Sequence, residues 1–101
     1  MINHINIGPM KYTVMDVDGL VDNTCDPPKN LDGWVKYRDA TIEVETHLSP
    51  EYRPLVVWHE VMHVLFEQLG AVQDEGFINA LSYKVAETVG RNWEFWKQLH
   101  G

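Results

Sequence analysis

The sequence predicts one α+β domain in which a small antiparallel β-sheet is followed by two main helices. β-Branched and aromatic residues alternate with polar ones in the first half of the chain, and helical spacing of apolar residues dominates the second half. Strand-forming segments that precede helix-forming ones are typical of the α+β class. Because 101 residues are too few for a second core, residues 1–101 are expected to form a single domain.

The first half of the chain predicts strands and loops. Residues 1–10 contain a Gly-Pro pair and predict a short extension, whereas KYTVMDV at 11–17 has the composition of a strand. Turn-forming residues dominate 18–32, which predicts a long loop. The alternating segments at 34–38 and 41–47 predict a β-hairpin.

The second half predicts helices. The main helix is expected over 54–70, because the segment begins with proline and ends with a glycine suited to a left-handed C-cap. Asp74 is a good N-cap for a second helix over 75–89, and a last short helix is expected over 93–99. The core face of the second helix is predicted from the helical spacing of Phe77, Ile78, Leu81, Val85 and Val89.

The last short helix carries an aromatic cluster. We expect Trp93 and Trp96 to hold this helix against the core, since large aromatic side chains are mostly buried. If the cluster is exposed instead, it predicts a surface for a partner or for self-association.

Composition narrows the classes of function. The formal charge is −7, with 15 acidic and 8 basic side chains, which argues against binding to nucleic acid or to anionic membranes. The single cysteine, Cys25, cannot form an internal disulfide and fits a reducing compartment. No apolar run approaches the roughly 18 residues of a membrane helix, and the N-terminal residues lack a signal-peptide pattern, so we expect a cytoplasmic protein.

The segment HEVMH at 59–63 carries the most specific chemistry. His59 and His63 are four residues apart, so on a helix both imidazoles project from one face and can bind one zinc ion. Glu60 is turned by about 100° and can act as general base toward a zinc-bound water. The alternative is an amphipathic helix with two structural histidines, because H-E-x-x-H fixes only three positions.

A catalytic zinc usually has three protein ligands and an open position for water. Glu75, at the first turn of the second helix, is the expected third ligand, and Asn79 one turn later could orient a ligand histidine. The other interpretation is that Glu75 only favours the helix dipole and Asn79 is solvated. Three other residues are candidates for the third zinc ligand, namely Asp74, Glu67 and His47.

The elements HEVMHVLFEQLG and DEGFINALSYK, together with the preceding hairpin, resemble small phage- and bacteria-encoded zincin-type metallopeptidases, which are minimal relatives in style of the ImmA/IrrE peptidases. The resemblance implies a minimal zincin-like fold, zinc as cofactor and, for a phage-encoded chain, a bacterial host cell. In the related gluzincin pattern E-x-x-x-D, Glu75 matches and Asn79 departs. An extended substrate beside a hairpin strand is also implied. An oxyanion stabiliser is needed as well, and the residues that qualify chemically are Tyr83, His47, Tyr37, Tyr52 and Arg38.

The sequence therefore predicts a zinc metallopeptidase that hydrolyses a peptide bond of a peptide or protein substrate, without nucleic-acid or membrane partners. His59, His63 and Glu75 are expected to bind the metal, and Glu60 is expected to activate the water. A second hypothesis is a zinc-binding interaction module with little activity. A third is a metal-free structural domain.

Overall fold

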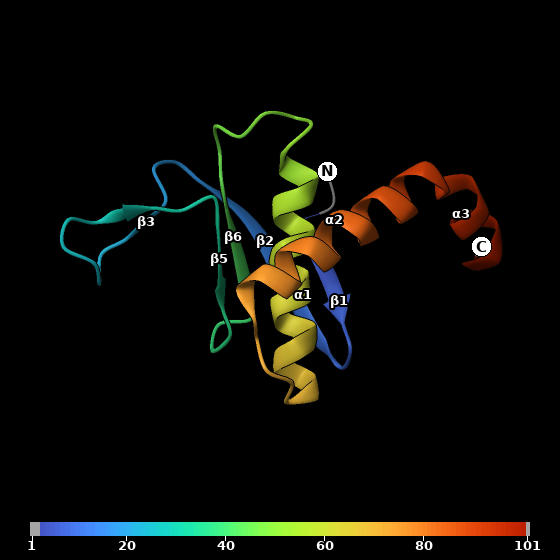
Figure 1. Cartoon of the computed structure of the whole chain (residues 1–101), viewed down its shortest axis with the longest axis horizontal. Helices are drawn as coiled ribbons and strands as arrows, with labels where there is room; N and C mark the ends of the chain where they lie inside the picture. The colour runs from blue at the N-terminus through green and yellow to red at the C-terminus, as the bar shows by residue number, and fades with distance from the viewer. Residues whose placement is uncertain (1–2, 101) are drawn as a thin grey trace.

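The computed structural model describes residues 3–100, which form a mixed sheet, a small two-stranded ribbon and three helices (Figure 1). Four strands form the main sheet in the order β1-β2-β6-β5. Their bounds are His4–Ile7 for β1, Met10–Val17 for β2, Gly33–Lys36 for β5 and Thr41–Glu45 for β6. The α+β class predicted from the sequence is confirmed.

The sheet is mixed, so the expectation of an antiparallel sheet was wrong. β5 and β6 form the predicted antiparallel hairpin, but β6 inserts between β5 and β2 and runs parallel to β2. The physical reason lies in β6 itself, since Ile42 and Val44 are fully buried and require a central position. Segment 18–32 is long enough to carry the chain from β2 to the far edge.

Residues 4–10, expected to be an extension, instead form the first strand and the turn of a β-hairpin, and residues 1–2 lie outside the described part of the chain. β1 pairs antiparallel with β2, and Gly8, with a φ of 57°, belongs to the turn between them. A Cβ at Gly8 would lie 2.4 Å from the side-chain oxygen of Gln68, whose amide donates a hydrogen bond of 2.8 Å to the Ile7 carbonyl. This contact ties β1 to the end of the main helix.

The helices follow the predicted local signals closely. α1 spans Arg53–Leu69 and ends at Gly70, which has the left-handed φ of 65°. α2 spans Glu75–Arg91, and the side chain of Asp74 accepts a hydrogen bond of 2.8 Å from the backbone of Phe77 at its start. α3, over Trp93–His100, completes the chain.

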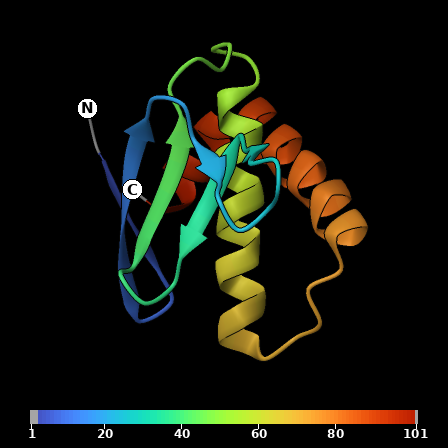
Figure 2. The same ribbon diagram turned by 90° about the vertical axis from the view of Figure 1, so that its left-hand side faces the viewer.

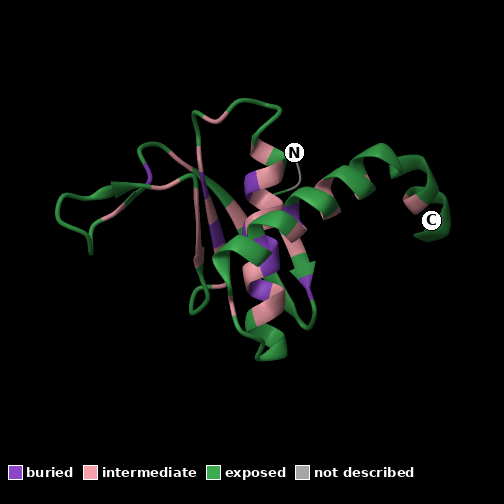
Figure 3. Ribbon diagram, in the orientation of Figure 1, coloured by how far each residue is buried: buried purple, intermediate pink, exposed green. Residues whose placement is uncertain are grey.

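The sheet, α1 and α2 form three successive layers (Figure 2). Among residues 3–100, α2 packs against α1 and α3 but contacts no strand. The core therefore lies mainly between the sheet and α1, where most buried residues gather (Figure 3). It comprises Ile7, Tyr12, Ile42, Val44, Val56, Val61, Met62, Val64 and Ile78.

Two parts of the chain lie outside this core. The predicted loop contains a short ribbon of β3 (Val21–Asp22) and β4 (Lys29–Asn30), which projects from the body (Figure 1). Among the described elements α3 contacts only α2, and Trp93 is 57% exposed, so the expected packing of Trp93 against the core was wrong. Phe77 is likewise 58% exposed, because α2 has only one neighbouring layer.

None of the helices in the described part of the chain is both long and apolar enough to span a membrane.

Candidate metal centre

The two histidines of HEVMH lie on one face of α1, one turn apart. Their Nε2 atoms are 3.2 Å from each other, and their side chains are 20% exposed for His59 and 15% for His63. On the other side of the helix, Val61, Met62 and Val64 are buried in the core. This packing fixes the rotation of α1 and turns both imidazoles away from the sheet toward α2.

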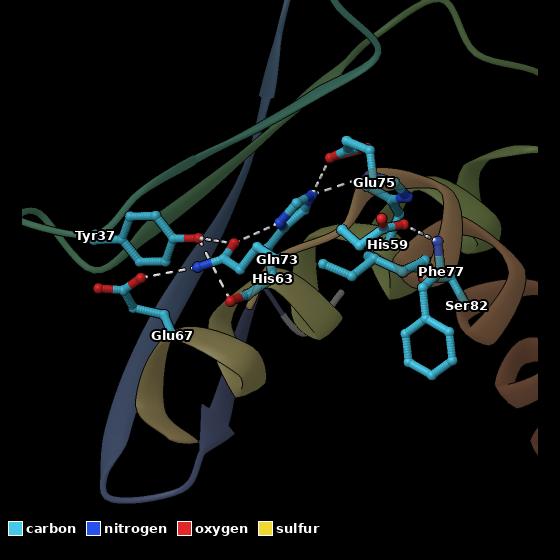
Figure 4. A network of polar contacts seen from close by, with 10 residues as sticks. Tyr37, His59, His63, Glu67, Gln73, Glu75, Phe77 and Ser82 are labelled. Carbon is cyan, nitrogen blue, oxygen red and sulfur yellow. Dashed lines mark hydrogen bonds and ion pairs between the residues drawn. The ribbon is translucent and has the colours of Figure 1, made fainter. Parts of the chain in front are cut away.

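Glu75 approaches the same point from the start of α2. Its carboxylate oxygens lie 2.5 Å from Nε2 of His63 and 3.1 Å from Nε2 of His59 (Figure 4). The N-cap Asp74 begins α2 one residue earlier, so that Glu75 occupies the first helical position. The four residues 70–73 form a connection short enough to bring this position beside the second histidine.

The three groups fit a metal ion. Ligand atoms around a tetrahedral zinc at about 2.0–2.1 Å lie about 3.3 Å from one another, close to the spacing of the two Nε2 atoms. The other ring nitrogen of His63, Nδ1, lies 2.7 Å from the Gln73 side-chain oxygen and must carry a hydrogen to donate to it. Nε2 of His63 then faces the Glu75 carboxylate, and either a proton or a metal ion between these two acceptor atoms satisfies the contact.

Glu60 belongs to the same cluster but occupies a different environment. Its carboxylate lies within 4.8 Å of the ligand nitrogens of His59 and His63, and the residue is 7% exposed. The pKa of this carboxyl is raised to about 7, mainly because burial disfavours its charged form. The nearby His63 opposes this rise, and the negative charge of Glu75 adds to it. A carboxyl group with a pKa near neutrality is suited to accepting a proton at physiological pH.

Comparison of the chain with protein-family models, curated proteins and solved structures finds no match.

Glu75 and Glu60 both approach the histidine pair, and their positions suggest different tasks. The Glu75 oxygens are in direct contact with both Nε2 atoms, and its side chain is mostly exposed. Glu60 is adjacent to His59 on α1 and projects toward β5, where a Cβ on Gly33 would lie 2.8 Å from its Oε2. Both carboxylates are thus within reach of the histidine pair, Glu75 in direct contact with both Nε2 atoms and Glu60 buried against β5.

A cavity of about 390 Å³ opens in front of the candidate metal centre. Its lining includes His59, Glu60, His63 and Glu75, together with the side chains of Lys29, Leu31, Asp32, Tyr52, Leu55, Val56, Asn79 and Tyr83. The Tyr52 hydroxyl donates a hydrogen bond of 3.0 Å to Asp32, which joins the start of α1 to the start of β5. A second hollow of about 310 Å³ shares Gly33, Glu60 and His63 with the first.

The structure separates the other predicted site residues. Tyr83 and Asn79 line the main cavity, but within residues 3–100 Asn79 forms no hydrogen bond with either histidine. His47 lies outside both hollows and pairs with Asp18 at 2.7 Å, so it is not placed to stabilise an oxyanion. Of the other two candidates for the third ligand, Asp74 caps the start of α2, and Glu67 accepts a hydrogen bond from the side chain of Gln73.

Sequence reasoning missed Gln73 and Gly33. Gln73 was part of a connecting turn, and its only sequence signal is an amide two residues before the third ligand. Gly33 was part of the Asp-Gly turn signal, but in the structure it begins β5 and leaves room for Glu60. Both roles depend on contacts between elements that are remote in the chain.

Proposed function

We propose that this protein is a zinc-dependent metallopeptidase that hydrolyses a peptide bond in a peptide or protein substrate. The observation that carries the proposal is the convergence of His59, His63 and Glu75 at one point, with the buried carboxyl of Glu60 beside it. Two imidazoles and a carboxylate, with space in front, form the ligand set of catalytic zinc sites in several peptidases.

The same ligand set also suits ferrous iron. Zinc is favoured by Glu60, because a buried carboxyl beside the ligands serves hydrolysis but has no task in dioxygen chemistry at iron. The helical i, i+4 spacing of the histidines with the glutamate between them is the arrangement of zinc hydrolases.

The residues of the chain then have distinct roles. A bound zinc would supply a Lewis acid that activates water and polarises the substrate carbonyl. Glu60 accepts the proton of the attacking water and can deliver it to the leaving amine. The pKa of Glu60, raised to about 7, suits both steps in one cycle.

The substrate is proposed to bind as an extended chain along β5. This strand is one of the two edges of the main sheet, since among the described strands it pairs only with β6. The two hollows meet at Gly33, Glu60 and His63, so a chain lying along β5 would pass directly in front of the metal. Backbone hydrogen bonds to an edge strand are a common mode of peptide recognition.

Tyr83 is proposed to stabilise the oxyanion. Its side chain lines the cavity, and in the described part of the chain its hydroxyl has no hydrogen-bond partner, so it can donate to a substrate oxygen. The Tyr52 hydroxyl is already committed to Asp32. We further propose a cytoplasmic setting, because the exposed free thiol of Cys25 fits a reducing compartment.

The test compares wild type with Glu60→Gln and His63→Ala, all purified without an affinity tag. Elemental analysis should find about one zinc per chain in wild type and in Glu60→Gln, and little in His63→Ala. A mixture of unstructured peptides, followed by mass spectrometry, should show new termini only with wild type.

Each outcome has a clear meaning. A different metal in wild type would contradict the choice of zinc, and no metal would overturn the site as a whole. Zinc binding by wild type without any cleavage would instead support the zinc-binding interaction module. Equal cleavage by wild type and Glu60→Gln would remove the assigned role of Glu60.

A further inference from the structure

The connection between α1 and α2 places one polar side chain, Gln73, directly behind the second histidine. The Gln73 Oε1 atom lies 2.7 Å from Nδ1 of His63, on the opposite side of the ring from Glu75 (Figure 4). The Gln73 amide nitrogen donates a hydrogen bond of 2.9 Å to Oε2 of Glu67. The three side chains therefore form a chain of contacts that ends at the candidate metal centre.

The carboxylate of Glu67 decides how the Gln73 amide is oriented. If the amide were flipped, its carbonyl oxygen would face the Glu67 carboxylate, and two acceptors would oppose each other. With the amide nitrogen toward Glu67, the carbonyl oxygen must face His63. The Tyr37 hydroxyl lies 3.3 Å from the same oxygen and 3.4 Å from the carbonyl oxygen of His63, and it can donate its hydrogen to either, so the Glu67 carboxylate decides the orientation.

This orientation determines which nitrogen of His63 carries the hydrogen. A carbonyl oxygen can only accept, so Nδ1 must donate, and in the neutral ring Nε2 then carries the lone pair that a metal would use. Such outer hydrogen bonds also hold the ring in place and raise its basicity as a ligand.

We propose that Gln73 is the positioning residue of His63 and that Glu67 orients Gln73 for this task. The proposal rests on the proposed metal site. Glu67 lies four residues after His63 on α1, and Gln73 lies two residues before Glu75, so one short connection supplies both the third ligand and the support for the second. Asn79, the residue expected in this role, is replaced by an amide from a different element.

Two variants test the proposal. Gln73→Leu removes the contacts of this side chain with His63, Glu67 and Tyr37 at similar volume. The double variant Glu67→Gln with Gln73→Glu keeps the number of hydrogen bonds and the net charge, because the new carboxylate accepts from His63 and the new amide donates to it. Gln98→Leu, the same substitution on α3, is the matched control.

The first readout is zinc affinity, measured by competition with a chromogenic chelator. Gln73→Leu should bind zinc about 10- to 100-fold more weakly than wild type, as expected when an outer hydrogen bond to a ligand is lost. The double variant should bind within threefold of wild type or more tightly, and Gln98→Leu should be unchanged. A Gln73→Leu variant within threefold of wild type, or a double variant as weak as Gln73→Leu, would overturn the proposal.

The second readout does not depend on the metal. In the chelator-treated protein at pH 9, ¹⁵N NMR of the His63 ring should show the hydrogen on Nδ1 in wild type and in the double variant. In Gln73→Leu it should move to Nε2, where Glu75 accepts it. Wild type that binds no zinc but has the Nδ1 hydrogen would overturn the proposed function and leave the positioning role supported, whereas an Nε2 hydrogen in wild type would overturn the positioning role.

Discussion

The carboxyl group of Glu60 lies between α1 and the edge strand β5, close to Gly33 and Val56. A charged carboxylate in such a place loses hydration, and this loss is the main cause of its raised pKa. The same burial that suits Glu60 to accept a proton at neutral pH makes its charged form unfavourable for folding. At the scale of single residues, burial of Glu60 therefore lowers the stability of the fold at neutral pH and at the same time gives its carboxyl a pKa suited to proton transfer.

Glu60→Gln should stabilise the metal-free protein at pH 8. The pKa of Glu60 rises from 4.5 to about 7 on folding. Its contribution to the free energy of unfolding is therefore fully present below pH 4.5, where the carboxyl is protonated in both states, and is lost as the pH rises through 7. The variant should exceed wild type by about 1–3 kcal/mol at pH 8 and equal it near pH 4.5. Urea unfolding of the two chelator-treated proteins at pH 8 and near pH 4.5 measures this difference in the free energy of unfolding. A difference that does not change with pH would contradict the prediction.

Gly33→Ala should reduce peptide hydrolysis far more than zinc affinity. Its new Cβ would lie 2.8 Å from both Oε2 of Glu60 and Cγ1 of Val56, so the base must move while the three ligands keep their positions. Overpacking of this kind costs about 1–3 kcal/mol. Zinc titration, peptide cleavage and urea unfolding measure the three effects.

Gly90→Ala is the matched control for Gly33→Ala. A Cβ at Gly90 in α2 meets no atom within 4 Å, so the substitution should stabilise the protein by about 0.5–1 kcal/mol without loss of cleavage. Equal loss of cleavage in both variants would show that the close contact at Gly33 is irrelevant to the site.

At the scale of elements, the site depends on how two helices begin and end. Gly70 is the C-cap of α1, and Asp74 is the N-cap of α2, so the connection between the two helices is short. This connection brings the start of α2 beside the histidine pair of α1, so that Glu75 in the first turn of α2 contacts both histidines. A carboxylate in a first turn is also favoured by the helix dipole.

Asp74→Ala should weaken zinc binding even though Asp74 is not a ligand. Loss of its hydrogen bond to the backbone of Phe77 removes the N-cap and costs about 1 kcal/mol of unfolding free energy. The first turn of α2 then frays, and Glu75 lies within it. Urea unfolding and zinc competition measure the two effects, and Asp39→Ala, in the turn between β5 and β6, controls for the lost charge. Unchanged zinc affinity in Asp74→Ala would show that the cap does not position Glu75.

At the scale of the whole molecule, the candidate metal centre lies between two layers. In the described part of the chain, α2 packs against α1 but not against the sheet, so α1 holds it in place. Two ligands come from α1 and one from α2, and a bound ion would link these layers directly. Zinc should thus stabilise the outer layer of a small domain with a modest core.

Zinc should raise the melting temperature markedly relative to chelator-treated protein. At free zinc about 1,000 times the dissociation constant, binding contributes about 4 kcal/mol, and about 1 kcal/mol shifts a domain of this size by roughly 4–8 °C. Glu75→Ala should lose most of this rise, whereas Glu87→Ala, farther along α2, should keep it. Circular dichroism melting measures both, and an equal rise in the two variants would place the third ligand elsewhere.

The sequence by itself determined the α+β class, the helix boundaries and the histidine pair with its glutamate. These features depend on neighbours within a few residues, namely caps at Gly70 and Asp74 and the four-residue spacing of His59 and His63.

The tertiary structure decided the rest. It alone placed β6 parallel to β2, left Trp93 exposed, and chose Gln73 over Asn79 as the partner of His63. Strand order and side-chain partners are set by which surfaces are buried together, and residues 10 or more positions apart carry no local signal of that choice. The residues that support the candidate site therefore lay in segments predicted as turns, whereas His59, Glu60 and His63 lie in a recognisable motif and Glu75 lies at a predicted helix start.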